Sequence, residues 1–218
     1  DNMYIIVVGA GEIGEKLVDL ALKNKDDVVI IEKNKEKCEE ISKKYDAIVI
    51  NADATVKETL VEAGVDNADA LVTTADDATN LLVISLAKTM GVPSLVALVN
   101  NEESRPMFME KGVNVVGNPN IITAEYLYRA VRRPLVKDFM TLGQRAEIFK
   151  IVVPQDSKII GKRVKDAGLP KMVSIIAIER DSEVIIPAED TCFKAGDLVT
   201  LLARKDKIDK TMEIFFKK

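Results

Sequence analysis

Short runs of β-branched and apolar residues alternate with amphipathic stretches through the first 120 residues, and this alternation limits the folds open to the chain. The runs fall at residues 4–8, 28–31, 47–50, 70–73, 95–99 and 113–116. They are apolar throughout, which is typical of parallel strands that helices cover on both faces. Between the first two runs, residues 13–24 carry apolar side chains at the spacing of one buried helix face. The pattern predicts an α/β fold with a Rossmann-like, doubly wound parallel sheet.

Beyond residue 120 the alternation gives way to one helix and a smaller set of strands. Apolar spacing predicts a helix over residues 121–136, which Pro134 should end or kink, and Gly143 indicates a connector over residues 137–145. Strands are expected at 147–153, 173–179, 183–186 and 198–203, the last two flanking a turn at 195–197, with short helices around 160–167 and 207–215. We therefore predict a Rossmann-like domain at residues 1–136, a connector at 137–145 and a small α+β domain at 146–218.

A glycine motif, G-A-G-E-I-G, follows the first strand directly and opens the first helix. Gly9 permits the tight turn, Gly11 has no Cβ to hold a pyrophosphate away from the backbone, and Gly14 allows close packing of the helix on the sheet. The free amides and partial positive charge of the helix N-terminus would face the phosphates. The alternative is a tight turn that binds nothing, but the strand–loop–helix context favours a nucleotide.

The second strand ends at Glu32, 21 residues after Gly11, where a carboxylate can accept hydrogen bonds from both hydroxyls of an adenosine ribose. It would repel a 2′-phosphate, and only Lys33 follows rather than an arginine, which favours NAD(H) over NADP(H). Glu12 beside the phosphates adds repulsion for a triphosphate, so NAD(H) is favoured over ATP. Glu32 could also be a solvated charge at a strand end.

Polar residues follow three further strands on the same edge of the sheet, where ligands of such folds bind. They lie at residues 51–55, 73–77 with Asn80, and 100–101. Asp53, Thr55, Asp76 and Asp77 could contact a ligand or could cap the helices that follow them, and one residue could do both.

Composition excludes several classes of function. The chain contains no histidine, which removes Ser-His-Asp and Cys-His nucleophile systems, histidine-ligated zinc and a histidine general base. A formal net charge of −4 argues against a general nucleic-acid binder. Two isolated cysteines, Cys38 and Cys192, suit a reducing cytoplasm. No apolar run is long enough to span a membrane, the run at residues 4–8 is too short for a signal peptide, and Met3 is expected to be the natural start.

Several motifs together resemble those of the KTN/RCK family, the TrkA-like cytosolic nucleotide-binding regulatory subunits of potassium transport systems. In the first domain they are V-V-G-A-G-E-I-G at 7–14, I-I-E-K-N at 30–34, N-A-D-A-T at 51–55, A-L-V-T-T-A-D-D-A-T-N at 70–80 and G-V-N-V-V-G-N-P at 112–119. In the second they are I-I-G-K-R-V at 159–164 and I-I-P-A-E-D-T-C-F-K-A-G-D-L-V at 185–199. The glycine motif alone is common to many dehydrogenases, but its pairing with the late motifs is more specific.

The resemblance implies a non-catalytic regulator that binds NAD+ or NADH and gates an integral-membrane, TrkH-like potassium transporter. It implies a homodimer that assembles into a tetramer or larger ring on the inner face of the membrane, with residues 121–135 as the crossover between partner domains. By this resemblance Gly9, Ala10, Gly11, Glu12 and Ile13 would contact the phosphates, Glu32 and Lys33 the ribose, Asp53 and Ala54 the adenine, and Thr74, Ala75 and Asp77 the far side of the ligand. ATP-responsive relatives often carry arginine where Glu12 stands, and some place an acidic metal ligand where Asn120 stands. ATP or ADP is therefore possible but less favoured, no metal site is expected, and no ligand site is predicted in the C-terminal domain.

Two other classes of function remain. A small NAD-dependent dehydrogenase would use the last 75 or so residues as a substrate domain, but histidine is absent and Tyr126 and Tyr128 lack a Tyr-x-x-x-Lys pattern. A nucleic-acid-binding redox sensor would use Arg129, Arg132 and Arg133 as a basic patch, although such residues are more often a solvated helix face or a subunit contact.

Overall fold

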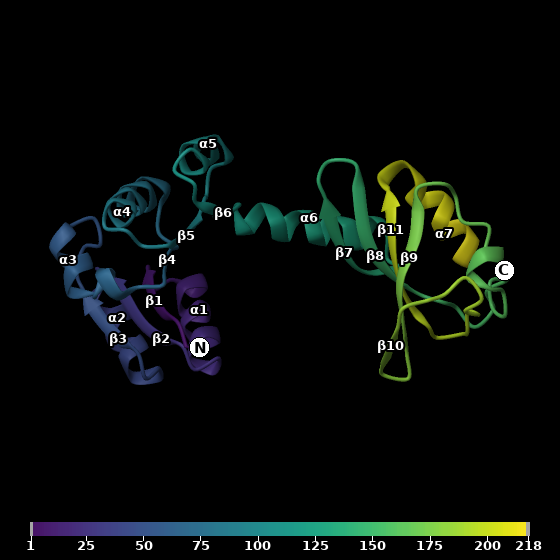
Figure 1. The fold of residues 1–218 in the computed structure, drawn as a ribbon, viewed down its shortest axis with the longest axis horizontal. Coiled ribbons are helices and arrows are strands. Elements are labelled where there is room, and N and C mark those ends of the chain that lie inside the picture. The colour runs from purple at the N-terminus through teal and green to yellow at the C-terminus, as the bar shows by residue number, and fades with distance from the viewer. Residues whose placement is uncertain (1, 217–218) are drawn as a thin grey trace. The chain divides into compact units, whose positions relative to one another are not determined.

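The computed structural model describes residues 2–216, whose contacts divide the chain into two compact units, Asp1–Ala124 and Glu125–Lys218 (Figure 1). Helix α6 (Pro119–Arg132) contributes residues to both units. No helix among the described residues combines the length and the apolar character that crossing a membrane requires.

The N-terminal unit contains a six-stranded sheet of order β3-β2-β1-β4-β5-β6, in which every pairing is parallel. Its strands are β1 (Tyr4–Val8), β2 (Asp27–Glu32), β3 (Ile48–Asn51), β4 (Ala70–Thr73), β5 (Ser94–Leu98) and β6 (Asn114–Val116). The helices between them are α1 (Glu12–Lys23), α2 (Lys35–Lys44), α3 (Lys57–Glu62), α4 (Asp77–Thr89) and α5 (Arg105–Met109). The predicted doubly wound sheet is thereby confirmed, and its strand order reverses direction between β1 and β4.

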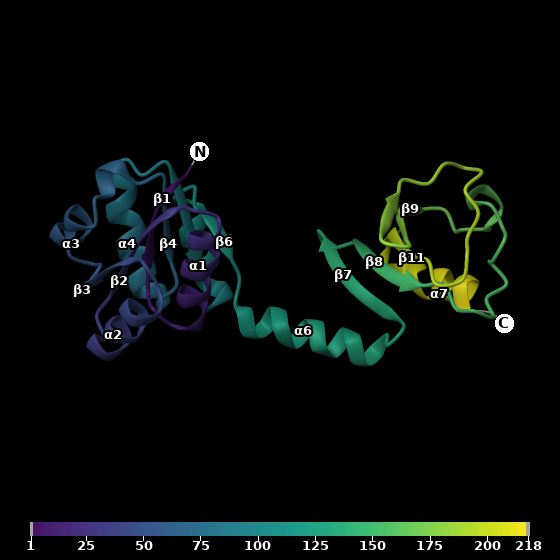
Figure 2. The same ribbon diagram turned by 90° about the horizontal axis from the view of Figure 1, so that it is seen from below.

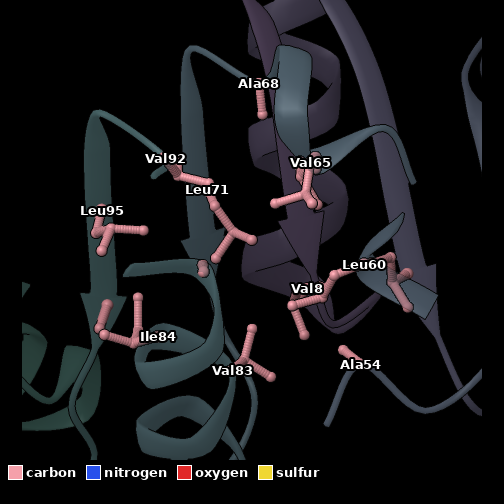
Figure 3. Packing of buried hydrophobic residues seen from close by; sticks show 14 of the residues in the cluster. Val8, Ala54, Leu60, Val65, Ala68, Leu71, Val83, Ile84, Val92 and Leu95 are labelled. Atoms are coloured by element: carbon pink, nitrogen blue, oxygen red, sulfur yellow. The ribbon is translucent and has the colours of Figure 1, made fainter. Parts of the chain in front are cut away.

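Each face of this sheet packs against its own set of helices. Along β1, Ile6 and Val8 belong to one cluster. Figure 3 shows Val8 in this cluster with Leu60 of α3 and Ile84 of α4. Val7 points the other way, into a second cluster that includes Val18 of α1 and Ile41 of α2. Because both faces of the central strands are buried, these strands need apolar residues at successive positions, which explains the uninterrupted runs at β1 and β2.

The C-terminal unit is built on a five-stranded antiparallel sheet of order β10-β9-β11-β8-β7. Its strands are β7 (Val136–Leu142), β8 (Ala146–Val152), β9 (Val173–Arg180), β10 (Glu183–Ile185) and β11 (Leu198–Arg204), followed by α7 (Ile208–Phe216). Helix α7 lies against this sheet (Figure 2) and contributes Ile208 and Phe215 to a core with Phe149 and Leu201. The predicted α+β character of this region is confirmed.

The expected connector at residues 137–145 is wrong, because most of it forms β7, which pairs with β8 through a turn at Gly143. Val136 and Phe139 pack on the C-terminal core, and this burial makes the segment part of the sheet. The turn at 195–197 does not join β10 to β11 as a hairpin, since β9 lies between those two strands. Only a 3-10 turn, Val164–Asp166, forms in the region expected to be helical around 160–167.

The helix expected over 121–136 begins at Pro119 and ends at Arg132, two residues before Pro134. The contact division falls inside this helix, before the predicted domain limit at residue 136. Where each domain ends as an independently folding unit stays a prediction.

Candidate nucleotide-binding site

A cleft opens at the carboxyl ends of β1, β2 and β4, next to the point where the strand order reverses. Ligands of open α/β sheets bind at such switch points, because the loops on either side leave the sheet in opposite directions. Eight of the predicted site residues line the cleft: Gly9, Gly11, Glu32, Lys33, Asp53, Ala54, Thr74 and Ala75. The structure thus brings together residues from four loops that are up to 66 positions apart in sequence.

The three glycines of the loop after β1 have three different environments. Gly9 has a φ of 101°, and a Cβ there would lie 2.7 Å from the Thr74 Oγ1. A Cβ on Gly14 would lie 1.9 Å from the carbonyl oxygen of Gly9, so only glycine allows the helix to approach this closely. A Cβ on Gly11 would meet no atom within 4 Å. Gly11 is therefore not needed for internal packing, and its bare backbone faces the open cleft.

Helix α1 presents its N-terminus beside this loop. Gly11 is the N-cap residue, and no side chain caps the helix within the described part of the chain. The first amides of a helix have no intrahelical acceptor, and the helix dipole places partial positive charge there. These amides are suited to bind phosphate oxygens.

Glu32 is held by two backbone amides. Its Oε2 accepts a hydrogen bond from the Ala10 N–H at 2.8 Å, and its Oε1 accepts one from the Asn34 N–H at 2.8 Å. The first bond joins the end of β2 to the glycine loop and fixes the carboxylate beside the cleft. Each carboxylate oxygen has two acceptor sites, so the side chain retains capacity for two ribose hydroxyls.

Asp53 both stabilises its own loop and lines the cleft. Its Oδ1 accepts hydrogen bonds from the Thr55 N–H at 2.9 Å and the Thr55 hydroxyl at 2.7 Å. These bonds, the hydroxyl first, lower the pKa of Asp53, and they hold the carboxylate in its charged form. They do not cap the helix that follows, because the N-cap residue of α3 is Val56 and no side chain among the described residues caps that helix. The capping alternative is therefore wrong for Asp53, and its contact with a ligand stays a prediction.

The remaining predicted residues do not line the cleft. Ala10 is buried and takes part only through the bond from its amide to Glu32. Glu12 and Ile13 lie in the first turn of α1 with exposed side chains. Asp77 accepts hydrogen bonds from the backbone amides of Asn100 and Asn101, at 2.7 and 2.9 Å, which tie it to the loop after β5.

Two polar residues of the cleft, Lys37 and Thr79, were not predicted from the sequence. Each lies in the first turn of a helix that starts directly after a strand of the site, α2 after β2 and α4 after β4. A short strand-to-helix loop brings the first helical turn to the same edge, and this could have identified both. Thr79 is also bonded to Asp76, whose pKa is lowered by hydrogen bonds from the Thr79 hydroxyl and amide.

The residues present fit the adenosine and phosphate groups of a nucleotide. The open face of Gly11 and the uncapped helix suit phosphates, and the fixed carboxylate of Glu32 suits a ribose. Among residues 2–216, no group of three or more cysteines and carboxylates is arranged to hold a metal ion.

Comparison with known proteins places both units in one family. The model of the TrkA-N domain matches residues 5–119, and that of the TrkA-C domain matches residues 148–215. The Trk system potassium uptake protein TrkA homolog of Methanothermobacter thermautotrophicus is 33% identical over 215 residues, which cover 98% of this chain and 99% of that protein. The homolog of Pyrococcus abyssi is 32% identical over 225 residues, covering 99% of each chain. The chain spans only half of the Archaeoglobus fulgidus homolog, with 33% identity.

Solved structures agree on the fold. The GsuK channel matches all of this chain and 40% of its own, with a TM-score of 0.69 and 16% identity. The GsuK channel bound to NAD matches over the same shares, with a TM-score of 0.62 and 17% identity. At such low identity these likenesses support the fold alone. The family models and the relatives confirm the KTN/RCK resemblance, and the chain belongs to the TrkA family of Trk potassium uptake proteins.

Proposed function

We propose that this protein is a non-catalytic regulatory subunit of a potassium uptake system that binds NAD(H) and controls a membrane transporter. The observation that carries the proposal is the carboxylate of Glu32, fixed by the Ala10 amide between the glycine loop and the cleft. This places a ribose acceptor beside a phosphate-binding helix terminus, as a dinucleotide requires.

The charges around the cleft favour NAD(H) over related nucleotides. Glu32 would repel the 2′-phosphate of NADP(H), and Glu12 in the first turn of α1 would repel a third phosphate. Lys33 and Lys37 border the cleft and offset part of this negative charge, so ATP and ADP are weaker candidates rather than excluded ones.

A small NAD-dependent dehydrogenase is the alternative. It would need a proton donor and acceptor beside the nicotinamide, and the chain has no histidine to supply one. An absorbance assay for NADH formation with common alcohols and hydroxy acids separates the two. Turnover with any of them would favour the enzyme.

Control of a transporter requires that the nucleotide bind two conformations with different affinity. Couplings of about 1–3 kcal/mol change affinities roughly 5–150-fold, which suffices for gating when several sites act together. We propose a homodimer that assembles into a tetramer or larger ring on the cytoplasmic face of the membrane. The names of the relatives, which place them in a Trk potassium uptake system, support a membrane potassium transporter as its partner, and we propose from the sequence resemblance that this partner is TrkH-like.

Equilibrium titrations with NAD+, NADH, NADPH, ATP and ADP test the nucleotide proposal. We expect NAD(H) to bind more tightly than NADPH or ATP. Glu32→Gln should weaken NAD(H) binding about 10- to 100-fold, because hydrogen bonds to a charged group contribute about 1.5–3 kcal/mol. Glu36→Gln, the same charge change at an exposed position of α2, is the matched control and should leave affinity unchanged. Failure of all five nucleotides to bind would refute the proposal.

The transporter and the ring need separate tests. Co-purification with a candidate TrkH-like transporter, followed by potassium flux with NAD+ and NADH, tests the partner. Light scattering of the full chain tests the assembly, and a monomer would contradict the ring.

A further inference from the structure

The loops that follow β4, β5 and β6 are joined by the side chains of Asp77, Asn80, Asn100 and Asn118, which we call the asparagine relay. All four residues belong to the N-terminal unit. At one end the relay holds Ala75, which lines the cleft, and at the other it reaches Asn118, directly before the first residue of α6.

At the cleft, the relay holds both backbone groups of Ala75. The Ala75 N–H donates to Asn80 Oδ1 at 3.0 Å, and the Ala75 carbonyl accepts from Asn80 Nδ2 and Asn100 Nδ2, each at 3.0 Å. Asn80 is fully buried and also donates to the Leu98 carbonyl at 2.8 Å. A displacement of Ala75 must therefore move Asn100 or leave buried polar groups unpaired, which is costly.

In the middle, Asp77 fixes the backbone after β5. Its Oδ1 accepts from the Asn100 N–H at 2.7 Å and from Asn100 Nδ2 at 3.1 Å, and its Oδ2 accepts from the Asn101 N–H at 2.9 Å. Burial raises the pKa of Asp77, but the hydrogen bonds from Asn100 and Asn101 outweigh this and lower it. The carboxylate stays charged and ties the start of α4 to Asn100.

At the far end, one side chain serves two loops. Asn118 Nδ2 donates to the Asn100 carbonyl at 2.6 Å, while Asn118 Oδ1 accepts from the Asn120 N–H at 2.8 Å. Asn118 precedes Pro119, the first residue of α6, and so its oxygen caps the helix. Its nitrogen connects that cap to the relay.

The geometry points to Asn118 as a positioning residue that couples nucleotide occupancy of the cleft to the first turn of α6. A nucleotide that contacts Ala75 limits the movement of its backbone. Asn80 and Asn100, which are hydrogen-bonded to Ala75, then move less as well. Asn118, which is hydrogen-bonded to Asn100, transmits this limit to the cap of α6. This inference rests on the proposed function, because it requires a nucleotide in the cleft.

A plain helix cap needs only the oxygen of Asn118, whereas the relay also needs its nitrogen. Asn118→Asp separates the two roles. Aspartate caps helices as well as asparagine does, but it cannot donate to the Asn100 carbonyl. Asn118→Ala removes both roles, and Asn101→Ala is a matched control, since Asn101 Oδ1 caps a different turn by accepting from the Glu103 N–H.

The experiment is hydrogen–deuterium exchange of the full chain with and without saturating NADH, followed in peptides covering residues 117–124. In the wild type we expect NADH to slow exchange there by about fivefold or more, the lower end of typical couplings. Asn118→Asp should bind NADH saturably, yet NADH should not slow its exchange relative to the same variant without NADH. Asn118→Ala should exchange faster in both states, and Asn101→Ala should keep the slowing.

The outcomes separate the relay from the function on which it rests. If NADH binds but leaves residues 117–124 unchanged in the wild type, or if Asn118→Asp retains the slowing, the relay is refuted and nucleotide binding stands. If a parallel titration shows that neither NADH nor NAD+ binds, the proposed function fails and the relay fails with it.

Discussion

One carboxylate from each unit shows two opposite uses of the same chemical group. In the N-terminal unit, Glu32 accepts two backbone hydrogen bonds and still borders an open cleft. In the C-terminal unit, Asp197 is 1% exposed, and Arg180 donates to both of its oxygens, at 2.7 and 2.8 Å. The Lys194 amide donates to Asp197 as well, at 2.8 Å. The acceptor capacity of Glu32 is left for a ligand, whereas that of Asp197 is used within the fold.

A second buried carboxylate of the C-terminal unit follows the same rule. Glu147 is 5% exposed and pairs with Arg129 at 2.9 Å and with Arg133 at 3.7 Å. Arg129 in turn lies over the ring of Phe139, 4.7 Å from its centre. The comparison shows that a conspicuous charged residue indicates a binding site only where internal partners leave it free.

The buried pair of Asp197 and Arg180 should contribute more to stability than any other interaction tested below. Asp197→Ala leaves Arg180 without its carboxylate partner, and breaking a buried ion pair costs about 3–5 kcal/mol. We expect a loss near the lower value in the free energy of unfolding, because Arg180 keeps some contact with water. Urea unfolding followed by circular dichroism measures it, since the chain has no tryptophan. Nucleotide affinity should not change, and Asp190→Ala, at an exposed pair, is the control.

In the glycine loop of the N-terminal unit, substitutions at Gly14 and Gly11 should separate an effect on stability from an effect on nucleotide binding. Gly14→Ala places a Cβ 1.9 Å from a backbone oxygen and should cost about 2–3 kcal/mol of stability, since overpacking forces the backbone to shift. Gly11→Ala has a compatible φ of −72° and meets no atom, so stability should stay within about 0.5 kcal/mol. It should nevertheless weaken nucleotide binding, because the new methyl group projects toward the phosphates. If Gly11→Ala leaves nucleotide affinity intact, the phosphates do not bind here.

The stability of the protein at acid pH should depend on the pairing of Arg180 with Asp197. Burial raises its pKa, but hydrogen bonds from Arg180 and Lys194 outweigh this and lower it below the ordinary value of about 3.9. A lowered folded-state pKa gives stability that is complete above the unfolded-state pKa and lost as the pH falls through the folded-state value. We expect wild-type stability to fall below about pH 4, and Asp197→Asn to be less stable at neutral pH with a flatter decline. Parallel curves for the two proteins would contradict this assignment.

The smallest effect concerns surface ion pairs. Lys16 lies 2.6 Å from Asp19 in α1, but the Lys16 side chain is 65% exposed, so solvent screens their attraction, and Asp19 keeps a second partner in Lys23 at 2.9 Å. Lys16→Ala should leave the urea midpoint unchanged within error at low and high salt. A measurable loss would show that exposed charges also contribute to the fold and would weaken the contrast between the units.

Periodicity identified most elements because burial on two faces leaves a strong pattern. The strands around Val7 and Ile30 were predicted within a residue or so, since both faces of that sheet are apolar. The pattern failed at β7, where exposed residues such as Lys137 and Met140 alternate with Phe139, and where Gly143 suggested a loop. An edge strand with one buried face resembles a connector until its partner strand is known.

At the site, too, residues that belong to a local sequence pattern were predicted, and residues that depend on the fold were not. The glycine motif predicted Gly9 and Gly11 at the cleft, and the spacing of 21 residues from Gly11 predicted Glu32 there. Asp77 was predicted to contact the ligand, but the structure directs its oxygens to the loop after β5. Lys37 and Thr79 line the cleft through helix starts that carry no motif of their own.

The fold class, the glycine loop and the acidic residue at the end of β2 could be predicted from the sequence, because each depends on residues close together in the chain. Which carboxylates are free and which are paired within the fold became visible only in the folded protein. The partners of Asp197 and Asp77 lie 17 and 23 residues away, respectively. Hydrogen bonds between residues this far apart form only when the chain folds. Only the folded protein therefore shows whether a carboxylate is paired internally or is available to a ligand.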